Sequence, residues 1–266
     1  MINRLSKRKN KLSAVYLLPN LVTLGAMFCG FYSIVSGING LYIQSAIFIL
    51  IAMILDGLDG RVARLTNTQT SFGEHFDSLS DLLCFGIAPA LLIYLFSFSP
   101  LTFGYLAKLS SIACFVFIAS AAIRLARFNS RNQSTDKKYF IGLASPASAA
   151  TMVCYVWLLK DMNVDVSSYL TVTFVMIISL SILMVSNIAY FSFKDFNIKQ
   201  KVPHLMLFVI SLIVSFISFD PPKVLFIFFL LYALSGPAMF FTRRLRRNGL
   251  YDSNITHKTD DKEKTL

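Results

Sequence analysis

The stretch DGLDGRVARLTNTQTSFGEHFDSLSD, residues 56–81, holds four aspartates between long apolar runs. Asp56 and Asp59 are spaced i, i+3, and Asp77 and Asp81 are spaced i, i+4, so each pair would lie on one face of a helix. The polar segment LTNTQTSF between the two pairs predicts a loop. The stretch therefore predicts a helical hairpin with two carboxylates on each arm.

The second arm of this hairpin has a start signal of its own. Ser71, followed three residues later by Glu74, is a capping-box pattern, which favours a helix that begins at this serine. Small residues let membrane helices pack closely. The small residues near the acids are Gly57, Gly60, Ala63 and Gly73. Close packing of the arms would bring both carboxylate pairs within reach of one ion.

The runs around the hairpin indicate a membrane protein. The chain has 266 residues, of which 55% are hydrophobic, and a mean hydropathy of +0.62, whereas soluble proteins have more charge and fewer continuous apolar runs. The apolar runs are about 20 residues long, which is the length that crosses a bilayer as a helix. Eight spans are predicted: 18–38, 41–63, 77–98, 103–127, 144–160, 168–191, 203–219 and 223–241. The expected fold is an all-α bundle of about eight transmembrane helices.

The net charge of +11 is distributed unevenly along the chain. If the N-terminus is cytoplasmic, all of the 25 Lys and Arg residues except Lys108, Lys160 and Lys223 fall on the cytoplasmic side. This asymmetry follows the positive-inside rule and predicts that both termini are cytoplasmic. The charge is therefore a topological signal, with an attraction for anionic lipid headgroups, and does not indicate nucleic-acid binding. The sequence contains no CxxC motif, and all four cysteines lie within predicted spans: Cys29, Cys84, Cys114 and Cys154. We therefore interpret them as core residues.

The acids themselves indicate cation chemistry. Asp81 is followed at once by LLCFGIAPALLIY, and an ionisable residue at an apolar boundary is a functional hypothesis by default. Oxygen ligands suit hard divalent cations, and a cluster of four carboxylates has room for two ions, as in phosphoryl-transfer sites. Arg64 is placed to bind a phosphate oxygen. These features favour metal-dependent chemistry on a phosphate compound, but a solvated loop and a cation transporter remain alternatives.

The spacing Asp56-x2-Asp59-Gly60-x2-Ala63-Arg64-x8-Gly73-x3-Asp77-x3-Asp81 resembles the signature of the CDP-alcohol phosphatidyltransferases at every position. The resemblance covers roughly residues 17–150. The segments LLPNLVTLGAMFCGFYSI, FGIAPALLIY, AAIRLARFN and FIGLASPASAA are most similar to the membrane-embedded branch whose acceptor alcohol is L-serine. One position departs from the pattern: Ala144 stands where many members have the proline of GLP.

The resemblance implies a reaction and roles for these residues. A hydroxyl of a small alcohol would attack the lipid-bearing phosphorus of CDP-diacylglycerol, and CMP would leave. The implied ligands for one or two Mg²⁺ or Mn²⁺ ions are Asp56, Asp59, Asp77 and Asp81. Asp81 would also act as general base, because a serine hydroxyl is a poor nucleophile until its proton is removed. The implied CDP-lipid contacts are Asn20, Thr23, Gly60, Ala63, Arg64, Thr70 and Gly73.

The acceptor is less well defined than the reaction. Arg124 and Arg127, in AAIRLARFNSR, are the candidate acceptor ligands, because arginine recognises the carboxylate of L-serine well. Glycerol 3-phosphate would also favour arginine, inositol is a further alternative, and both residues could instead anchor the span as positive-inside residues. Ser145 and Ser148, spaced i, i+3, would provide close packing or hydroxyl contacts.

Four regions are expected on this interpretation. They are a basic cytoplasmic segment at 1–17, the catalytic core at 18–160, additional transmembrane helices at 161–242 and a cytoplasmic tail at 243–266. The expected location is the bacterial inner membrane, with the active site facing the cytoplasm. The expected partners are CDP-diacylglycerol, L-serine, membrane lipids and a second copy of the chain, because the family often forms homodimers.

Overall fold

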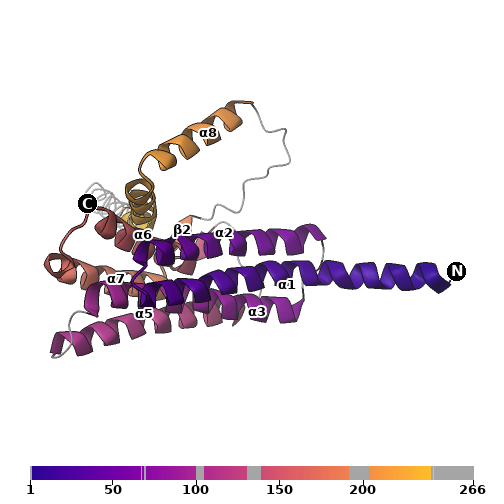
Figure 1. The fold of residues 1–266 in the computed structure, drawn as a ribbon, viewed down its shortest axis with the longest axis horizontal. Coiled ribbons are helices and arrows are strands. Elements are labelled where there is room, and N and C mark those ends of the chain that lie inside the picture. The colour runs from indigo at the N-terminus through magenta and orange to yellow at the C-terminus, as the bar shows by residue number, and fades with distance from the viewer. Residues whose placement is uncertain are drawn as a thin grey trace, which may run out of the picture.

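The computed structural model describes residues 2–66, 68, 70–99, 105–130, 139–191, 204–240 and 242. Long helices run side by side along the molecule, and the first of them extends beyond the others at the N-terminus (Figure 1). The helices are α1 (Ile2–Ile38), α2 (Tyr42–Thr66), α3 (Ser71–Asp81), α4 (Ala88–Ile93), α5 (Tyr105–Ser130), α6 (Ser145–Asp161), α7 (Leu170–Val185), α8 (His204–Phe219) and a last helix at Pro221–Phe240. The predicted tail at 243–266 lies outside the described residues.

Five helical segments of the described chain are long and apolar enough to cross a membrane. They are Leu17–Ile38, Ser71–Phe98, Ala107–Ser130, Val166–Val185 and Pro221–Phe240. A helix coincides with each of the eight predicted spans, but α6 and α8 have only 17 and 16 residues. The expectation of a helical membrane protein is confirmed, whereas the number of spans and the side of the termini stay predictions.

The first two helices form an antiparallel hairpin (Figure 1). Gly40 makes the turn with φ +76°, a left-handed conformation that glycine adopts without steric cost. Near the turn, the Ser33 hydroxyl lies 2.9 Å from both the Ser45 carbonyl oxygen and the Ser45 hydroxyl. Hydrogen bonds between polar side chains stabilise helix pairs in an apolar medium. The hairpin places the far end of α2, with its acids, beside α1.

The third span is a composite helix. It runs from α3 into the π-helical turn η1 (Leu82–Ile87), then α4, and ends in a second π-helical turn, η2 (Tyr94–Phe98). Pro89 follows η1 and has no N–H, so the regular bonding to the preceding turn is interrupted there. Such π turns are frequent at functional sites. Here the π turn begins directly after Asp81.

Two short strands were not predicted from the sequence. β1 (Tyr139–Ile141) pairs antiparallel with β2 (Ala189–Phe191), in the register Ile141 with Ala189. Gly142 follows β1 with φ +80°, and a Cβ on it would lie 2.4 Å from the Met184 carbonyl oxygen. Only glycine fits that conformation and that contact. The strands therefore fasten the start of α6 to the end of α7.

The buried core lies among α4, α5, α6 and α7, and includes Phe117, Met152 and Ile177. All four cysteines are buried free thiols, as predicted. Large apolar side chains on the outer faces are exposed, for example Phe115, Ile182 and Leu231, as expected for helices that face lipid. α8 stands away from the other helices (Figure 1).

Candidate metal centre and active site

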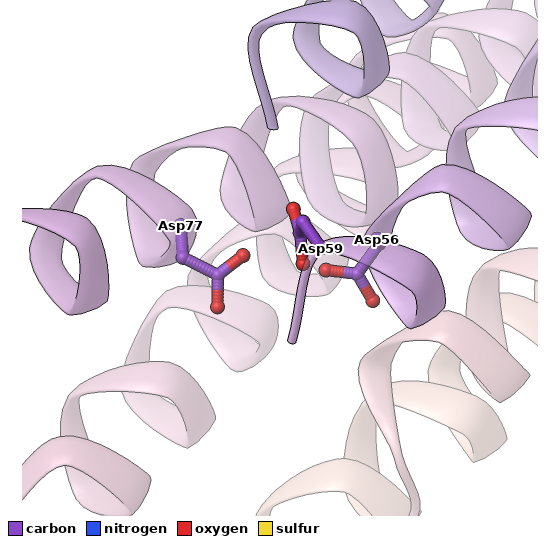
Figure 2. Close-up of side chains that lie close together, drawn as sticks. All are labelled: Asp56, Asp59 and Asp77. Atoms are coloured by element: carbon purple, nitrogen blue, oxygen red, sulfur yellow. The ribbon is translucent and has the colours of Figure 1, made fainter. Parts of the chain in front are cut away.

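Three of the four acids form a compact cluster. Asp56 and Asp59 project from α2 and Asp77 projects from α3, and their carboxylates point toward one another (Figure 2). One ligand oxygen from each lies within 4.8 Å of the others. Two oxygens on opposite sides of one Mg²⁺ would be about 4.2 Å apart, given bond lengths of about 2.1 Å. The cluster therefore matches the size of a divalent cation site after a small contraction.

A hydrogen bond from α1 holds Asp59 in place. Asp59 is buried, and the Thr23 hydroxyl donates to its Oδ2 at 2.7 Å. The same α1 segment accepts a hydrogen bond at the Thr23 carbonyl from the Ser80 hydroxyl of α3, at 3.4 Å. Partners that orient metal-binding carboxylates in this way tune metal sites. α1 therefore connects the two arms that carry the acids.

The start of α3 differs from the prediction. The N-cap is Thr70, whose hydroxyl accepts a hydrogen bond from the Gly73 N–H at 3.0 Å, and Ser71 is the first helical residue. The predicted capping box of Ser71 and Glu74 is therefore wrong by one position. Thr70 provides the cap because a threonine outside the helix can reach the third N–H inside it.

Asp77 has an unsatisfied oxygen. Its Oδ1 is buried and has no hydrogen-bond partner in the described part of the chain. A buried carboxylate oxygen without a partner is costly, so it indicates a missing ligand. The next residue, Ser78, accepts a hydrogen bond from the Asn129 side-chain amide at 2.9 Å, which ties α3 to the end of α5. The donor set, its size and the orphaned oxygen all fit a divalent cation.

Asp81 stands beside the cluster and outside the group of three. Its half-buried carboxyl group interacts with those of Asp56 and Asp77 and with the guanidinium of Arg124 from α5. The four predicted acids are thus brought together, but in different settings. Asp81 is the member that links the acids to an arginine.

The glycines of the hairpin have two different roles. A Cβ on Gly57 or Gly60 would meet no atom within 4 Å in the described structure, so the prediction that these two glycines allow close helix packing is wrong. A Cβ on Gly73 would instead lie 3.1 Å from the Thr70 hydroxyl and 3.3 Å from the Asn20 amide oxygen. The open face of α2 therefore leaves space for a ligand, whereas Gly73 allows α1 and α3 to approach.

The remaining predicted CDP-lipid residues lie at the same end of α2. The exposed Arg64 side chain folds back along α2, with its Nε donating to the Gly60 carbonyl oxygen at 2.9 Å. The Ala63 carbonyl oxygen accepts from the Thr68 N–H at 3.1 Å, which closes the end of the helix. The other N–H groups of Arg64 can extend from this face toward a phosphate.

The two predicted acceptor arginines lie one turn apart and have different surroundings. Arg124 donates from its Nη1 to the Ser145 hydroxyl at 2.8 Å, and its Nε is buried without a partner among the described residues. Arg127 donates to the Val185 carbonyl oxygen at 3.2 Å and to the Asn187 side chain. Arg127 therefore satisfies the end of α7, whereas Arg124 faces the acids.

The start of α6 explains the departure at Ala144. Ala144 is the N-cap of α6 with φ −64° and ψ 134°, and proline adopts this φ readily. The backbone geometry at this position is therefore one that proline or alanine can adopt. Ser145 follows directly and carries the contact with Arg124.

The sequence comparison agrees with this geometry. The sequence model of the CDP-alcohol phosphatidyltransferase family matches residues 16–185, more than half of the chain. The chain belongs to this family. Divalent metal ions are general in the family, and the matched region contains α2, α3 and all four acids. The acid cluster is thus a candidate metal centre of a CDP-alcohol phosphatidyltransferase.

Individual relatives are similar over half or more of this chain. The CDP-diacylglycerol–serine O-phosphatidyltransferase of Helicobacter pylori is 37% identical over 227 residues, covering 85% of this chain and 91% of the relative. The protein of the same name from Methanocaldococcus jannaschii is 32% identical over 207 residues, covering 77% and 88%. The one from Saccharomyces cerevisiae is 40% identical over 146 residues, covering half of each chain.

Sequence reasoning missed several residues that support the site. Ser80 and Asn129 link α3 to α1 and α5, and Asn187 contacts Arg127. Asn129 belongs to the RLARFN segment, so its proximity to the arginines was a usable signal. Ser80 and Asn187 carry no such signal, because their roles depend on contacts with distant segments.

Proposed function

We propose that this chain transfers the phosphatidyl group of CDP-diacylglycerol to the hydroxyl of L-serine and releases CMP. The observation that carries the proposal is the convergence of Asp56, Asp59 and Asp77 beside Asp81. The names of the relatives support serine as the acceptor. The five span-capable helices suit an enzyme whose substrate has acyl chains in the membrane and a nucleotide in water.

In this proposal, the three clustered carboxylates hold Mg²⁺ or Mn²⁺, and Asp81 contributes to the same centre. When bound, the cations would neutralise charge on the diphosphate and orient it for attack. Thr23 keeps Asp59 oriented through its 2.7 Å hydrogen bond. The chain's contribution is therefore a fixed set of oxygen ligands supported from α1.

Asp81 is the proposed general base. The serine oxygen bonds to the lipid-bearing phosphorus, the bond from that phosphorus to the oxygen of CMP breaks, and Asp81 takes the hydroxyl proton. Asp81 interacts with Asp56 and Asp77 on one side and with the Arg124 guanidinium on the other. A base placed between the acids and Arg124 lies where the CDP-diacylglycerol donor and the serine acceptor would meet.

The nucleotide end of the donor is proposed to lie over α2. Gly57 and Gly60 leave an open face there, and the N–H groups of Arg64 suit a phosphate oxygen. Asn20, Thr70 and Gly73 lie together at the start of α3. With Thr23 and Ala63, these residues are the proposed contacts of the CDP moiety.

The serine carboxylate is proposed to bind Arg124. Among the described residues, the Arg124 Nε and the buried hydroxyl of Ser148 have no hydrogen-bond partner, so both call for a polar ligand. Arg127 is the weaker candidate, because its guanidinium is already engaged at the end of α7. The same chemistry would also suit glycerol 3-phosphate, so the acceptor must be established by assay.

The surroundings of the enzyme are also part of the proposal. The chain is an integral membrane protein, and we propose that its active site faces the cytoplasm, where serine and CMP are found. The distribution of Lys and Arg supports this orientation. A bacterial inner membrane and a homodimeric state complete the proposal.

An acceptor assay tests the proposed function. Purified protein in lipid micelles, supplied with CDP-diacylglycerol and Mn²⁺ or Mg²⁺, should release CMP only when L-serine is added. Parallel reactions contain glycerol 3-phosphate or inositol at the same concentration. Release of CMP with one of these and not with serine would exclude the serine assignment, and ion flux without CMP release would favour a transporter.

A further inference from the structure

Two contacts fix how α5 lies against the third span. At the end of α5, the Asn129 side-chain amide donates to the Ser78 hydroxyl of α3 at 2.9 Å. Further along the pair, the Ala121 methyl carbon lies 3.4 Å from the position that a Cβ on Gly86 of η1 would take. The two segments therefore run antiparallel. Their register places Arg124 level with the end of α3, to within about one helical turn.

The start of α6 lies beside the same arginine. Its first residue, Ser145, is fully buried, and the Ser145 hydroxyl accepts a hydrogen bond from Nη1 of Arg124 at 2.8 Å. The next turn of α6 packs on η1, where Ala149 shares a buried cluster with Cys84 and Phe85. The contact between Ser145 and Arg124 therefore lies close to the π turn that follows the acids.

Backbone hydrogen bonds hold the start of α6 from its other side. The Gly142 N–H donates to the Ile188 carbonyl oxygen at 2.8 Å. The N–H of the fully buried Leu143 donates to the Leu183 carbonyl oxygen at 3.0 Å. Both donors lie directly before α6, and both acceptors lie near the end of α7. The Ser145 hydroxyl is therefore presented from a backbone that is already fixed.

The contact with Ser145 uses only one side of the Arg124 guanidinium. Nη1 is the terminal nitrogen farther from the Nε hydrogen, so the edge formed by Nε and Nη2 takes no part in this bond. The buried Nε on that edge has no hydrogen-bond partner among the described residues. Two parallel N–H groups on one edge match the two oxygens of a carboxylate. This edge therefore suits a carboxylate that binds side-on.

We propose that Ser145 is a positioning residue for Arg124, and that the edge formed by Nε and Nη2 binds the carboxylate of the acceptor. The inference rests on the proposed function and adds the group that orients the arginine. The arginine side chain loses much rotamer freedom when it is ordered. A fixed hydrogen bond at Nη1 orders the guanidinium in advance, so less freedom is lost when the acceptor binds. Without Ser145, the charge would remain but the acceptor would have to order it.

The test is the kinetics of Ser145→Ala, which removes the hydroxyl alone. The KM for serine should rise about tenfold, as expected for loss of a hydrogen bond to a charged group, while the KM for CDP-diacylglycerol and kcat change less than about twofold. Ser181→Ala is the matched control, because this buried serine donates to the Ile177 carbonyl oxygen of its own helix at 2.7 Å. The control should leave the KM for serine unchanged.

Two analogues of serine test the carboxylate directly. L-alanine keeps the carboxylate and lacks the reacting hydroxyl, so its inhibition constant against serine should rise with the KM for serine in Ser145→Ala. Ethanolamine keeps the hydroxyl and lacks the carboxylate, so its inhibition constant should not change. A rise for ethanolamine equal to that for L-alanine would overturn the assignment of this edge.

A second background shows whether Ser145 acts through Arg124. Arg124→Lys retains the positive charge but has no planar edge, so it should raise the KM for serine by itself. Adding Ser145→Ala to Arg124→Lys should raise this KM less than about twofold further, because the two residues act together. Equal effects of Ser145→Ala in both backgrounds, an unchanged KM for serine in Ser145→Ala, or an equal rise in Ser181→Ala would overturn the inference. If the unmodified chain releases no CMP with serine, the proposed function itself has failed.

Discussion

The two sides of the proposed active site are built in different ways. The proposed donor side, with the acids, comes from two consecutive helices, α2 and α3, and its four aspartates are spaced by the helical repeat. The proposed acceptor side brings together Arg124 of α5 and Ser145 of α6, two helices joined here by a hydrogen bond. Local spacing can specify a metal site, whereas the choice of acceptor depends on how distant helices pack. Changes on the two sides should therefore have separable effects.

A large effect is expected on the donor side, for Asp59→Asn. The amide keeps the size of the side chain but removes a charge from the cluster. We expect CMP release to fall by more than the roughly 10–100-fold typical of partners outside the ligand shell. Metal titration followed by calorimetry should show weaker binding. The control is Asp165→Asn, an exposed residue that caps the Val166–Tyr169 turn at the opposite end of α6, and equal losses in both variants would contradict the assignment.

The next-largest effect on serine kinetics is expected when one of the two arginines is replaced. Arg124→Gln should raise the KM for serine by about 10–100-fold, because it removes a charge-assisted bond to the carboxylate. Arg127→Gln loses its bonds to Val185 and Asn187, so it should lower the thermal unfolding temperature with little change in the KM for serine. Measured serine kinetics and melting curves separate the two roles. If Arg127→Gln instead raises the KM for serine and Arg124→Gln lowers only the unfolding temperature, the acceptor site lies nearer Arg127.

The smallest effects are expected for the replacement of two glycines, Gly60 and Gly30, by alanine. Gly60→Ala should leave the protein folded and stabilise α2 by about 0.5–1 kcal/mol, because a Cβ there meets nothing. If the CDP moiety lies on that face, the KM for CDP-diacylglycerol should rise about tenfold through crowding. Gly30→Ala should instead destabilise the fold by about 1–3 kcal/mol, because its Cβ would lie 2.7 Å from the Cys84 sulfur. Unchanged donor kinetics in Gly60→Ala would place the nucleotide elsewhere.

The same contrast explains what could be predicted from the sequence. The helices and the acid cluster were predictable, because long apolar runs and i, i+3 or i, i+4 spacing are local signals. The cap at Thr70 was misplaced by one residue because Thr70 and Ser71 are both suitable N-cap residues. Gly57 and Gly60 were misread because sequence does not distinguish a helix contact from an open face.

Features that depend on distant partners were not predictable. The strands have three residues each and pair segments about 50 positions apart, so no alternation in either one reveals them. The different surroundings of Arg124 and Arg127 depend on their contacts with Ser145 and with the end of α7. The position of the last helix depends on the packing of Gly236 against Tyr190 and on the hydrogen bond from Tyr190 to Ala233. Each of these contacts appears only when the helices are assembled.

The most direct test of the central claim is the turnover of Asp81→Asn with serine. The claim is that Asp56, Asp59 and Asp77 hold the metal while Asp81 takes the proton from the acceptor. The asparagine cannot accept that proton, so serine-dependent CMP release should be abolished while CDP-diacylglycerol and metal binding largely persist. Near-normal CMP release by this variant would contradict the account.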